Sequence, residues 1–547
     1  MKYVSTRGST PEQTFEDVLL SGLARDGGLF VPTAWPHVGP SEMAALEPLS
    51  YTRIVTRIVR PFIEESLISD AELAQIVDQA YAGFRDPAIA PLRQIDDDTW
   101  LLELFHGPTL AFKDFALQLL GGLFDHVLGK RGEHLTIVGA TSGDTGSAAI
   151  EACRDRDNLD IFMLFPEGRV SEVQRRQMTT VRSKNVFNIA LRGTFDDCQD
   201  LVKAMFADHE LRDSLNLSAV NSINWARVMG QTAYYFAAAA KLPVPDAKLS
   251  FVVPTGNFGN VYAGYAARKM GLPIEKLVVA SNRNDILYRF FAQGDMTITE
   301  VEASLSPSMD IQVSSNFERL LFDLLDRDGA AVLAAMQAFR AEGALPGASR
   351  LSAEARDLFE AQRLDDAETL DVIRSVHEEC GILLDPHTAV AVGAARKTPR
   401  DGNQRIVLAT AHPAKFPDAV EKATGLRPEL PVHLADLLDR DETAETLDND
   451  FMAVRDYVCA HAVSMPVPLS LAVIALGVGR ESRPAADQKP HCNQIQFRKM
   501  VYLGLDEYFD YVVTSEEAGK DKPHRAPFDI VLSKIGVPPS EIWMIGD

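Results

Sequence analysis

One lysine stands in a setting that suits amine chemistry. In HGPTLAFKDFALQLL (106–120), Lys113 lies between Phe112 and Phe115 at the start of an expected helix. Burial among aromatic rings lowers the pKa of an ammonium group and frees an amine that can attack a carbonyl. Taken alone, the pattern is more often that of a lysine whose stem covers apolar surface. Its weight therefore depends on the motifs that accompany it.

A turn rich in glycine and asparagine offers an anion site. In PTGNFGNVYAGYAARK (254–269), this turn follows an apolar run and precedes an alanine-rich helix. We expect Gly256 and Gly259 to let the backbone approach an anion closely. Asn257 and Asn260 would tolerate left-handed turn geometry and donate hydrogen bonds, and the helix start would add free N–H groups. A plain strand-to-helix turn is the alternative.

A second turn of small residues occurs in ATSGDTGSAA (140–149). Ser142, Gly143, Asp144 and Thr145 can present backbone N–H and hydroxyl donors to a carboxylate at the start of the next helix. The alternative is that Ser142 or Thr145 simply caps that helix.

A third set of polar residues follows a strand in LATAHPAKF (408–416). Thr410 falls at the strand end, where its hydroxyl could bond a neutral ring nitrogen, and His412 and Lys415 come just beyond. A single threonine at a strand end is usually structural. The combination of motifs, not any one of them, indicates a site.

Strand–turn–helix patterns recur through the chain and predict an α/β fold with parallel sheets. The clearest are at 135–155, 161–178, 249–271 and 405–425. The carboxyl ends of parallel strands would gather the turns described above.

The expected organisation has three parts. We expect a mainly helical N-terminal cap over 1–90, a catalytic body of two α/β lobes with an acidic helical tail over 91–464, and a separate piece over 465–547. Pro466 and Pro468 make a plausible linker before the last piece.

Composition limits the class of protein. The 547 residues are 46% hydrophobic and 24% charged, as in ordinary globular proteins, with a formal net charge of −23 that disfavours nucleic-acid binding. No apolar run is long enough for a membrane span, and the N-terminus lacks a signal core. The five cysteines are scattered, so we expect free thiols in a reducing cytoplasm, with neither disulfide framework nor metal site.

Six blocks, in order along the chain, resemble the threonine synthase family, and most closely its longer fungal and bacterial branch. They are HGPTLAFKDFALQ, ATSGDTGSAA, FPEGRVSEVQRRQMTT (165–180), NSINWARVMGQ (221–231), PTGNFGNVYAG and TAHPAKF. The resemblance runs from residue 3 to about 464. It implies the tryptophan-synthase-β-like fold, fold type II of pyridoxal-phosphate enzymes.

The resemblance also implies roles for the residues named above. Lys113 would hold pyridoxal 5′-phosphate as a Schiff base and shuttle protons. The cofactor phosphate would rest on Gly256, Asn257, Phe258, Gly259 and Asn260, and Thr410 would face the ring nitrogen. The loop of Ser142, Gly143, Asp144 and Thr145 would bind the substrate carboxylate. Arg169, His412 and Lys415 are candidates for the substrate phosphate.

Asp144 departs from a common pattern, because many relatives of this fold carry asparagine there. Contact between Asp144 and the 3′-oxygen of the cofactor therefore stays open, since two anions repel unless one is protonated.

The activity implied by the resemblance is that of a carbon–oxygen lyase that converts O-phospho-L-homoserine and water into L-threonine and phosphate. The implied partner is this small molecule, bound by a monomer or homodimer. A threonine or serine dehydratase of the same fold and a non-catalytic relative are the alternatives.

The last residues, LGLDEYFDYVV and onward (503–547), resemble the C-terminal half of a haloacid-dehalogenase-type hydrolase. The likeness rests on Ser515, Lys522 and the closing Gly546 and Asp547. That family uses an aspartate nucleophile in a DxDx[TV] motif, and none precedes this segment. We therefore expect a truncated or fused remnant, with a bifunctional phosphatase as the alternative.

Overall fold

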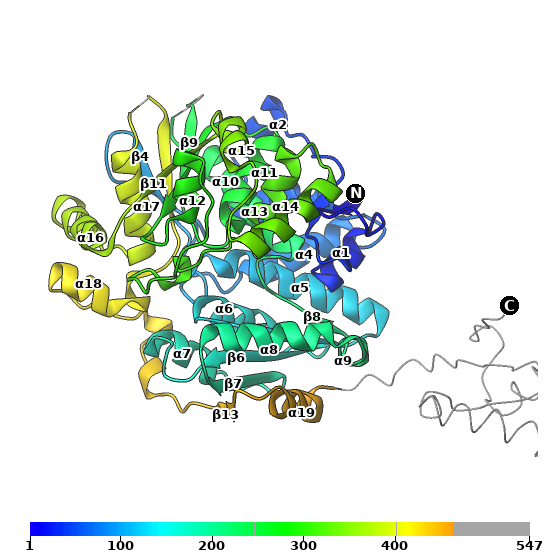
Figure 1. Ribbon diagram of the computed structural model, residues 1–547. Coiled ribbons are helices and arrows are strands. Elements are labelled where there is room, and N and C mark those ends of the chain that lie inside the picture. The colour runs from blue at the N-terminus through cyan, green and yellow to red at the C-terminus, as the bar shows by residue number, and fades with distance from the viewer. Residues whose placement is uncertain (245–246, 401, 464–547) are drawn as a thin grey trace, which may run out of the picture. The chain divides into compact units, whose positions relative to one another are not determined.

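Two β-sheets with largely parallel strands organise the chain (Figure 1). The computed structural model describes residues 1–244, 247–400 and 402–463. The C-terminal piece expected over 465–547 lies outside the described residues.

The larger sheet has six strands, and its neighbours are parallel except at one edge, where β3 runs antiparallel to β4. In sheet order the strands are β11 (Phe359–Arg363), β10 (Ile274–Ser281), β9 (Leu249–Pro254), β12 (Gln404–Ala409), β4 (Thr99–Glu103) and β3 (Leu92–Gln94). The strand β9 is buried along its whole length, which explains its mainly apolar sequence.

The smaller sheet has five strands, all parallel to their neighbours. In order they are β13 (Glu445–Asp448), β7 (Val186–Arg192), β6 (Leu159–Pro166), β5 (Leu135–Ala140) and β8 (Leu217–Ser218). The edge strand β13 corrects one expectation, because the acidic tail was predicted to be helical. Its segment ETLD is short and polar, and it becomes a strand by pairing with β7.

The N-terminal residues add four helices and a two-stranded antiparallel sheet. These elements are β1 (Tyr3–Ser5), α1 (Phe15–Ser21), β2 (Phe30–Pro32), α2 (Pro40–Ala44), α3 (Tyr51–Val59) and α4 (Asp70–Tyr81). Ser69 and Glu72 form a capping box at the start of α4.

The remaining helices cover the sheets or lie between them. They are α5 (Lys113–Arg131), α6 (Asp144–Cys153), α7 (Glu172–Thr179), α8 (Phe195–Ala207), α9 (His209–Ser214), α10 (Trp225–Lys241), α11 (Gly259–Lys269), α12 (Ile286–Tyr288), α13 (Phe317–Leu324), α14 (Gly329–Glu342), α15 (Ala348–Ala355), α16 (Asp366–Cys380), α17 (Pro386–Lys397), α18 (Pro417–Thr424) and α19 (Phe451–His461). None of the described helices is both long and apolar enough to cross a membrane.

Alternation along the strands of the large sheet divides the core into two layers. Leu101, Val252 and Val407 pack on the face covered by α16 and α17, whereas their neighbours Leu102 and Leu408 face the main core with α5 and α10. Figure 1 shows α5 between the two sheets, and most of its side chains are buried. Its first residue, Lys113, therefore lies between the lobes.

Candidate active site

Lys113 begins α5, and three chain segments meet around it. The preceding residue, Phe112, donates its backbone N–H to the carbonyl oxygen of Thr410 (2.9 Å), which ties the lysine to the carboxyl end of β12. The Phe112 ring centroid lies 5.1 Å from Lys113 Nζ. Phe115, two residues along α5, is fully buried against Tyr81 and Tyr234.

The surroundings of Lys113 favour an unprotonated amine. Burial lowers its pKa, the charges of Lys415 and Arg227 lower it further, and Asp144 acts in the opposite direction. Lowering of the lysine pKa by burial was expected, whereas the contributions of Lys415 and Arg227 to that lowering were not. A neutral amine is the form that can react with an aldehyde.

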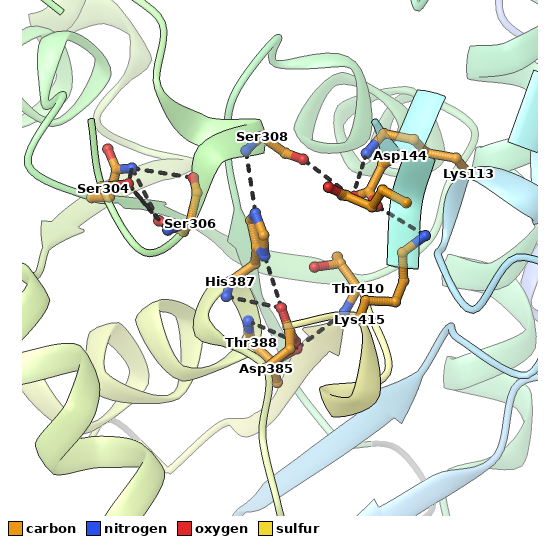
Figure 2. A network of polar contacts seen from close by, with 12 residues as sticks. Lys113, Asp144, Ser304, Ser306, Ser308, Asp385, His387, Thr388, Thr410 and Lys415 are labelled. Atoms are coloured by element: carbon orange, nitrogen blue, oxygen red, sulfur yellow. Dashed lines mark hydrogen bonds and ion pairs between the residues drawn. The ribbon is translucent and has the colours of Figure 1, made fainter. Parts of the chain in front are cut away.

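The Asp144 carboxylate is held by one lysine and one neutral donor at each oxygen (Figure 2). Lys113 Nζ and Ser308 Oγ each lie 3.1 Å from Oδ2. Lys415 Nζ lies 2.9 Å and Gln174 Nε2 2.8 Å from Oδ1. Burial alone would raise the pKa of Asp144, but the positive charges of Lys113 and Lys415 outweigh burial and hold it well below its usual range.

Asp144 is therefore ionised between two lysines. Lys415, with no exposed surface, also donates to the carbonyl oxygen of Thr109 (2.8 Å).

The loop before α6 departs in one detail from the expectation for its cap. The hydroxyl of Thr141 accepts the N–H groups of Gly143 (2.9 Å) and Gly146 (2.8 Å), so neither Ser142 nor Thr145 caps the helix. Gly143 has φ of +137°. Ser142 and Thr145 are half-buried at the helix start. Thr141 supplies the cap because it follows β5 directly and can reach over the turn to both N–H groups.

The loop between β9 and α11 shows a different use of its residues from the one expected. The residue in left-handed geometry is Phe258, with φ of +62°, and neither Asn257 nor Asn260 adopts it. The Phe258 ring is buried beside Phe291 and Phe317, and this packing balances the backbone strain. Strain of this kind in a tight loop is common where a ligand is held.

Asn260, at the end of this loop, has a side-chain N–H donor without a hydrogen-bond partner among the described residues. Its Oδ1 accepts hydrogen bonds from Tyr234 Oη (2.5 Å) and Tyr235 Oη (3.1 Å). Its Nδ2 is buried and has no partner among the described residues. An unpaired buried donor beside a helix N-terminus fits an anion such as the cofactor phosphate.

Thr410 lies one residue beyond β12, buried beside the start of α5. Its backbone N–H donates to Thr388 Oγ1 (3.2 Å), and Figure 2 shows its side chain near Lys415 and His387. Thr410 therefore falls at the strand end, as predicted, and its contact with the ring nitrogen stays a prediction.

The three phosphate candidates are placed very differently. Lys415 lies in the site, as described above. His412 is a neutral imidazole, because burial lowers its pKa to about 4, and its Nδ1 accepts the N–H of Ala414 (3.2 Å). Arg169 is exposed in the turn after β6.

Five polar residues near the site were not singled out from the sequence. They are Gln174, Arg227, Ser308, Asp385 and His387. The Asp-Pro pair at 385–386 signals a helix start, since aspartate caps and proline occupies the first turn. No local pattern marks the contact of Ser308 with Asp144, which are 164 residues apart.

The fold and site define an enzyme class. Two α/β lobes enclose a buried lysine, and the loop between β9 and α11 offers uncharged N–H donors to a phosphate. This is the arrangement of a fold type II pyridoxal-phosphate enzyme. The family model "Pyridoxal-phosphate dependent enzyme" matches residues 87–349. The models "Threonine synthase N terminus" and "Threonine synthase, C-terminal" match 2–81 and 388–458.

Close relatives agree with these matches. Threonine synthase of Pseudomonas aeruginosa is 54% identical over 84% of this chain and 98% of the relative. The crystal structure of pyridoxal-phosphate-bound threonine synthase from Brucella melitensis is 51% identical, with a TM-score of 0.82 over 84% of this chain and 99% of that one. Yeast threonine synthase is 40% identical, with a TM-score of 0.80 over 85% and 99%.

The chain belongs to the threonine synthase family, and pyridoxal phosphate is its cofactor. The family predicted from six sequence blocks is confirmed. The predicted likeness of the C-terminal piece is also confirmed, since a haloacid dehalogenase-like hydrolase model matches 491–547, outside the described residues.

Proposed function

We propose that this enzyme converts O-phospho-L-homoserine and water into L-threonine and phosphate. The observation that carries the proposal is the buried amine of Lys113 held against Asp144, with the cations Lys415 and Arg227 nearby. Relatives named threonine synthase support the same reaction.

The charges around Lys113 suit a phosphorylated amino acid better than a neutral hydroxyamino acid. Lys415 and Arg227 are the cations near Lys113, and Asp144 pairs with Lys415 and with the Lys113 amine. Asp114, next to Lys113, accepts the N–H (2.8 Å) and hydroxyl (2.6 Å) of Thr109, and burial raises its pKa to about 6. A phosphorylated substrate would bring anionic oxygens with which Lys415 and Arg227 can pair.

The chain's own residues would hold the cofactor at both ends. Lys113 would link to its aldehyde, the N–H groups of the 255–259 loop and Asn260 Nδ2 would hold its phosphate, and Thr410 would meet its ring nitrogen. When bound, the cofactor supplies an electron sink.

Lys113 would serve as the base that moves protons at the reacting carbons of the substrate. Its lowered pKa suits removal of a proton from Cα and proton transfer at Cβ, and Asp144 limits the motion of the amine. The leaving phosphate departs from Cγ, and water adds at Cβ. The loop of Ser142, Gly143 and Thr145 would hold the substrate carboxylate through N–H and hydroxyl groups. Lys415 is the best placed of the three candidates for the phosphate.

Thr410 would keep the ring nitrogen unprotonated, since a hydroxyl supplies no ionisable proton near neutral pH. This would moderate charge delocalisation and restrict side reactions. Thr410→Asp should therefore change the ratio of threonine to other products, and an unchanged ratio would refute this role.

The deciding experiment compares wild type with Lys113→Ala. Wild type should release phosphate and threonine from O-phospho-L-homoserine, whereas Lys113→Ala should lose activity by roughly three orders of magnitude or more. Borohydride reduction should trap the cofactor on Lys113, as located by mass spectrometry. A dehydratase would instead produce 2-oxobutanoate from threonine, and trapping on another residue would refute the assignment.

Three further expectations remain proposals. We expect a cytoplasmic enzyme acting as a monomer or homodimer, and the four described cysteines, all free, accord with a reducing compartment. We also expect no independent phosphatase in 465–547. Magnesium-dependent phosphatase activity that survives Lys113→Ala would contradict this expectation.

A further inference from the structure

A buried aspartate–histidine pair lies beside the Asp144 network. Asp385, fully buried, caps α17 and accepts the N–H groups of His387 (2.9 Å) and Thr388 (3.2 Å), as well as the hydroxyl of Thr388. His387 Nδ1 lies 2.8 Å from Asp385 Oδ1. Because Asp385 accepts from all these donors, Nδ1 donates to it, and Nε2 of His387 is left as an acceptor.

The free acceptor of His387 is used by a distant segment. The backbone N–H of Ser308, in the short turn Pro307–Met309, donates to His387 Nε2 (3.3 Å). The hydroxyl of the same serine donates to Asp144 Oδ2, the oxygen that also receives Lys113 Nζ. Figure 2 shows His387 between Ser308 and Asp385, with Ser308 reaching toward Asp144.

Ser308 also contacts the loop that we expect to hold the cofactor phosphate. Its carbonyl oxygen occupies the space beside Gly256, where an added Cβ would lie only 2.4 Å away. The 304–310 segment is anchored by Asp310, whose Oδ1 accepts from Asn282 (2.7 Å) and Ser304 (2.6 Å). Ser308 therefore lies between the cofactor-phosphate loop and the Asp144 carboxylate, and His387 holds its backbone.

We propose that Asp385 and His387 are a positioning pair that sets Ser308 and, through the Ser308 hydroxyl, the Asp144 oxygen that restrains Lys113. The groups that face Asp144 are Lys113 from α5, Lys415 from the turn after β12, His387 from α17 and the neutral Gln174 from α7. Loss of the Ser308 donor would leave Asp144 Oδ2 to interact more strongly with positive charge at Lys113 Nζ.

The test uses the cofactor-loaded enzyme and three variants: His387→Ala, His387→Gln and Ser308→Ala. The side-chain carbonyl of glutamine can accept the Ser308 N–H near the place of Nε2, whereas alanine cannot. In both alanine variants we expect the pH midpoint of the cofactor's visible absorbance to rise by about one unit, a roughly tenfold change in proton affinity. His387→Gln should restore the wild-type midpoint.

Kinetics should separate positioning from substrate binding. We expect kcat to fall roughly tenfold in His387→Ala with KM changed less than about twofold, since no substrate contact is removed. The double variant His387→Ala with Ser308→Ala should be no worse than either single variant, because both act through one hydrogen bond.

The matched control is His134→Ala. It removes another buried histidine–aspartate contact, His134 Nε2 to Asp160 Oδ2 at 2.9 Å, at the opposite end of β5 from Thr141. This variant should lose stability without a change in the absorbance titration or kcat. An unshifted titration in His387→Ala, or a glutamine variant no better than alanine, would overturn the proposal.

The absorbance titration needs only the bound cofactor, whereas the kinetic readout rests on the proposed function. If wild type fails to turn over O-phospho-L-homoserine while the absorbance shifts appear as expected, the proposed function fails and the positioning role stands.

Discussion

Gly256→Ala tests whether the phosphate loop and the Ser308 segment are packed as tightly as the structure indicates. The new Cβ would lie 2.4 Å from the Ser308 carbonyl oxygen, against 3.4 Å for the closest ordinary contact. One of the two segments must therefore move by about 1 Å, the difference between these distances. Both atoms concerned belong to backbone or are fixed to it, so no side-chain rotation can relieve the contact. Overpacking of this kind costs about 1–3 kcal/mol.

The displacement falls on the loop that we expect to hold the cofactor phosphate. If the whole cost appears in binding, cofactor affinity falls about 5- to 150-fold. The dissociation constant of the cofactor, measured from its absorbance on titration into cofactor-free protein, gives this change directly. Thermal unfolding of the same cofactor-free samples shows how much of the cost appears in the fold instead.

Two glycines provide controls. At Gly259, in the same loop, a Cβ would lie 3.2 Å from Asn316 Nδ2, and a side chain can yield by a few tenths of an ångström, so Gly259→Ala should lose less affinity. Exposed Gly129 on α5 has its nearest atom at 3.6 Å, so Gly129→Ala should bind cofactor as wild type does. Equal cofactor affinity in Gly256→Ala and Gly129→Ala would refute the packing argument.

Two predictions concern buried carboxylates. Asp144→Asn leaves Lys113 and Lys415 without their shared anion, so the pKa of Lys113 should fall further. The free energy of unfolding, measured with denaturant, should drop by about 3 kcal/mol. An unchanged free energy of unfolding would contradict the ion-pair network. Asp114 binds protons more tightly in the folded state, because burial raises its pKa from 3.8 to about 6. Its contribution to stability is therefore present at low pH and is lost as pH rises from about 4 to 6, so Asp114→Asn should gain stability relative to wild type over that range, by up to about 3 kcal/mol. A stability difference between the two proteins that does not vary with pH would show that Asp114 titrates normally.

Local patterns were enough to predict the architecture and the centre of the site. Strands of a parallel sheet are buried on both faces, so their sequences are mainly apolar. An apolar run followed by a small-residue turn and an alanine-rich helix therefore marks a βα unit. Lys113 and the loop around Gly256 were found in this way, as was the strand-end position of Thr410. Each is marked in the sequence by residue types only a few positions away.

Other features depend on contacts that no local pattern encodes. The left-handed residue of the phosphate loop is Phe258 because three distant aromatic rings hold its side chain, although asparagine has the stronger intrinsic preference. The polar tail segment ETLD became the strand β13 because β7 offered an unpaired edge.

The sequence by itself determined the family and the cofactor and predicted Lys113 as the reactive lysine, since these depend on residue types at short, fixed spacings. Only the tertiary structure decided the protonation state of the site. Burial and the charges of Lys415 and Arg227 lower the pKa of Lys113, and the charges of Lys113, Lys415 and His387 lower that of Asp144 against the effect of burial. These groups come from separate elements of the chain. Electrostatic energy depends on distance and burial in space, and neither can be read from separation along the chain.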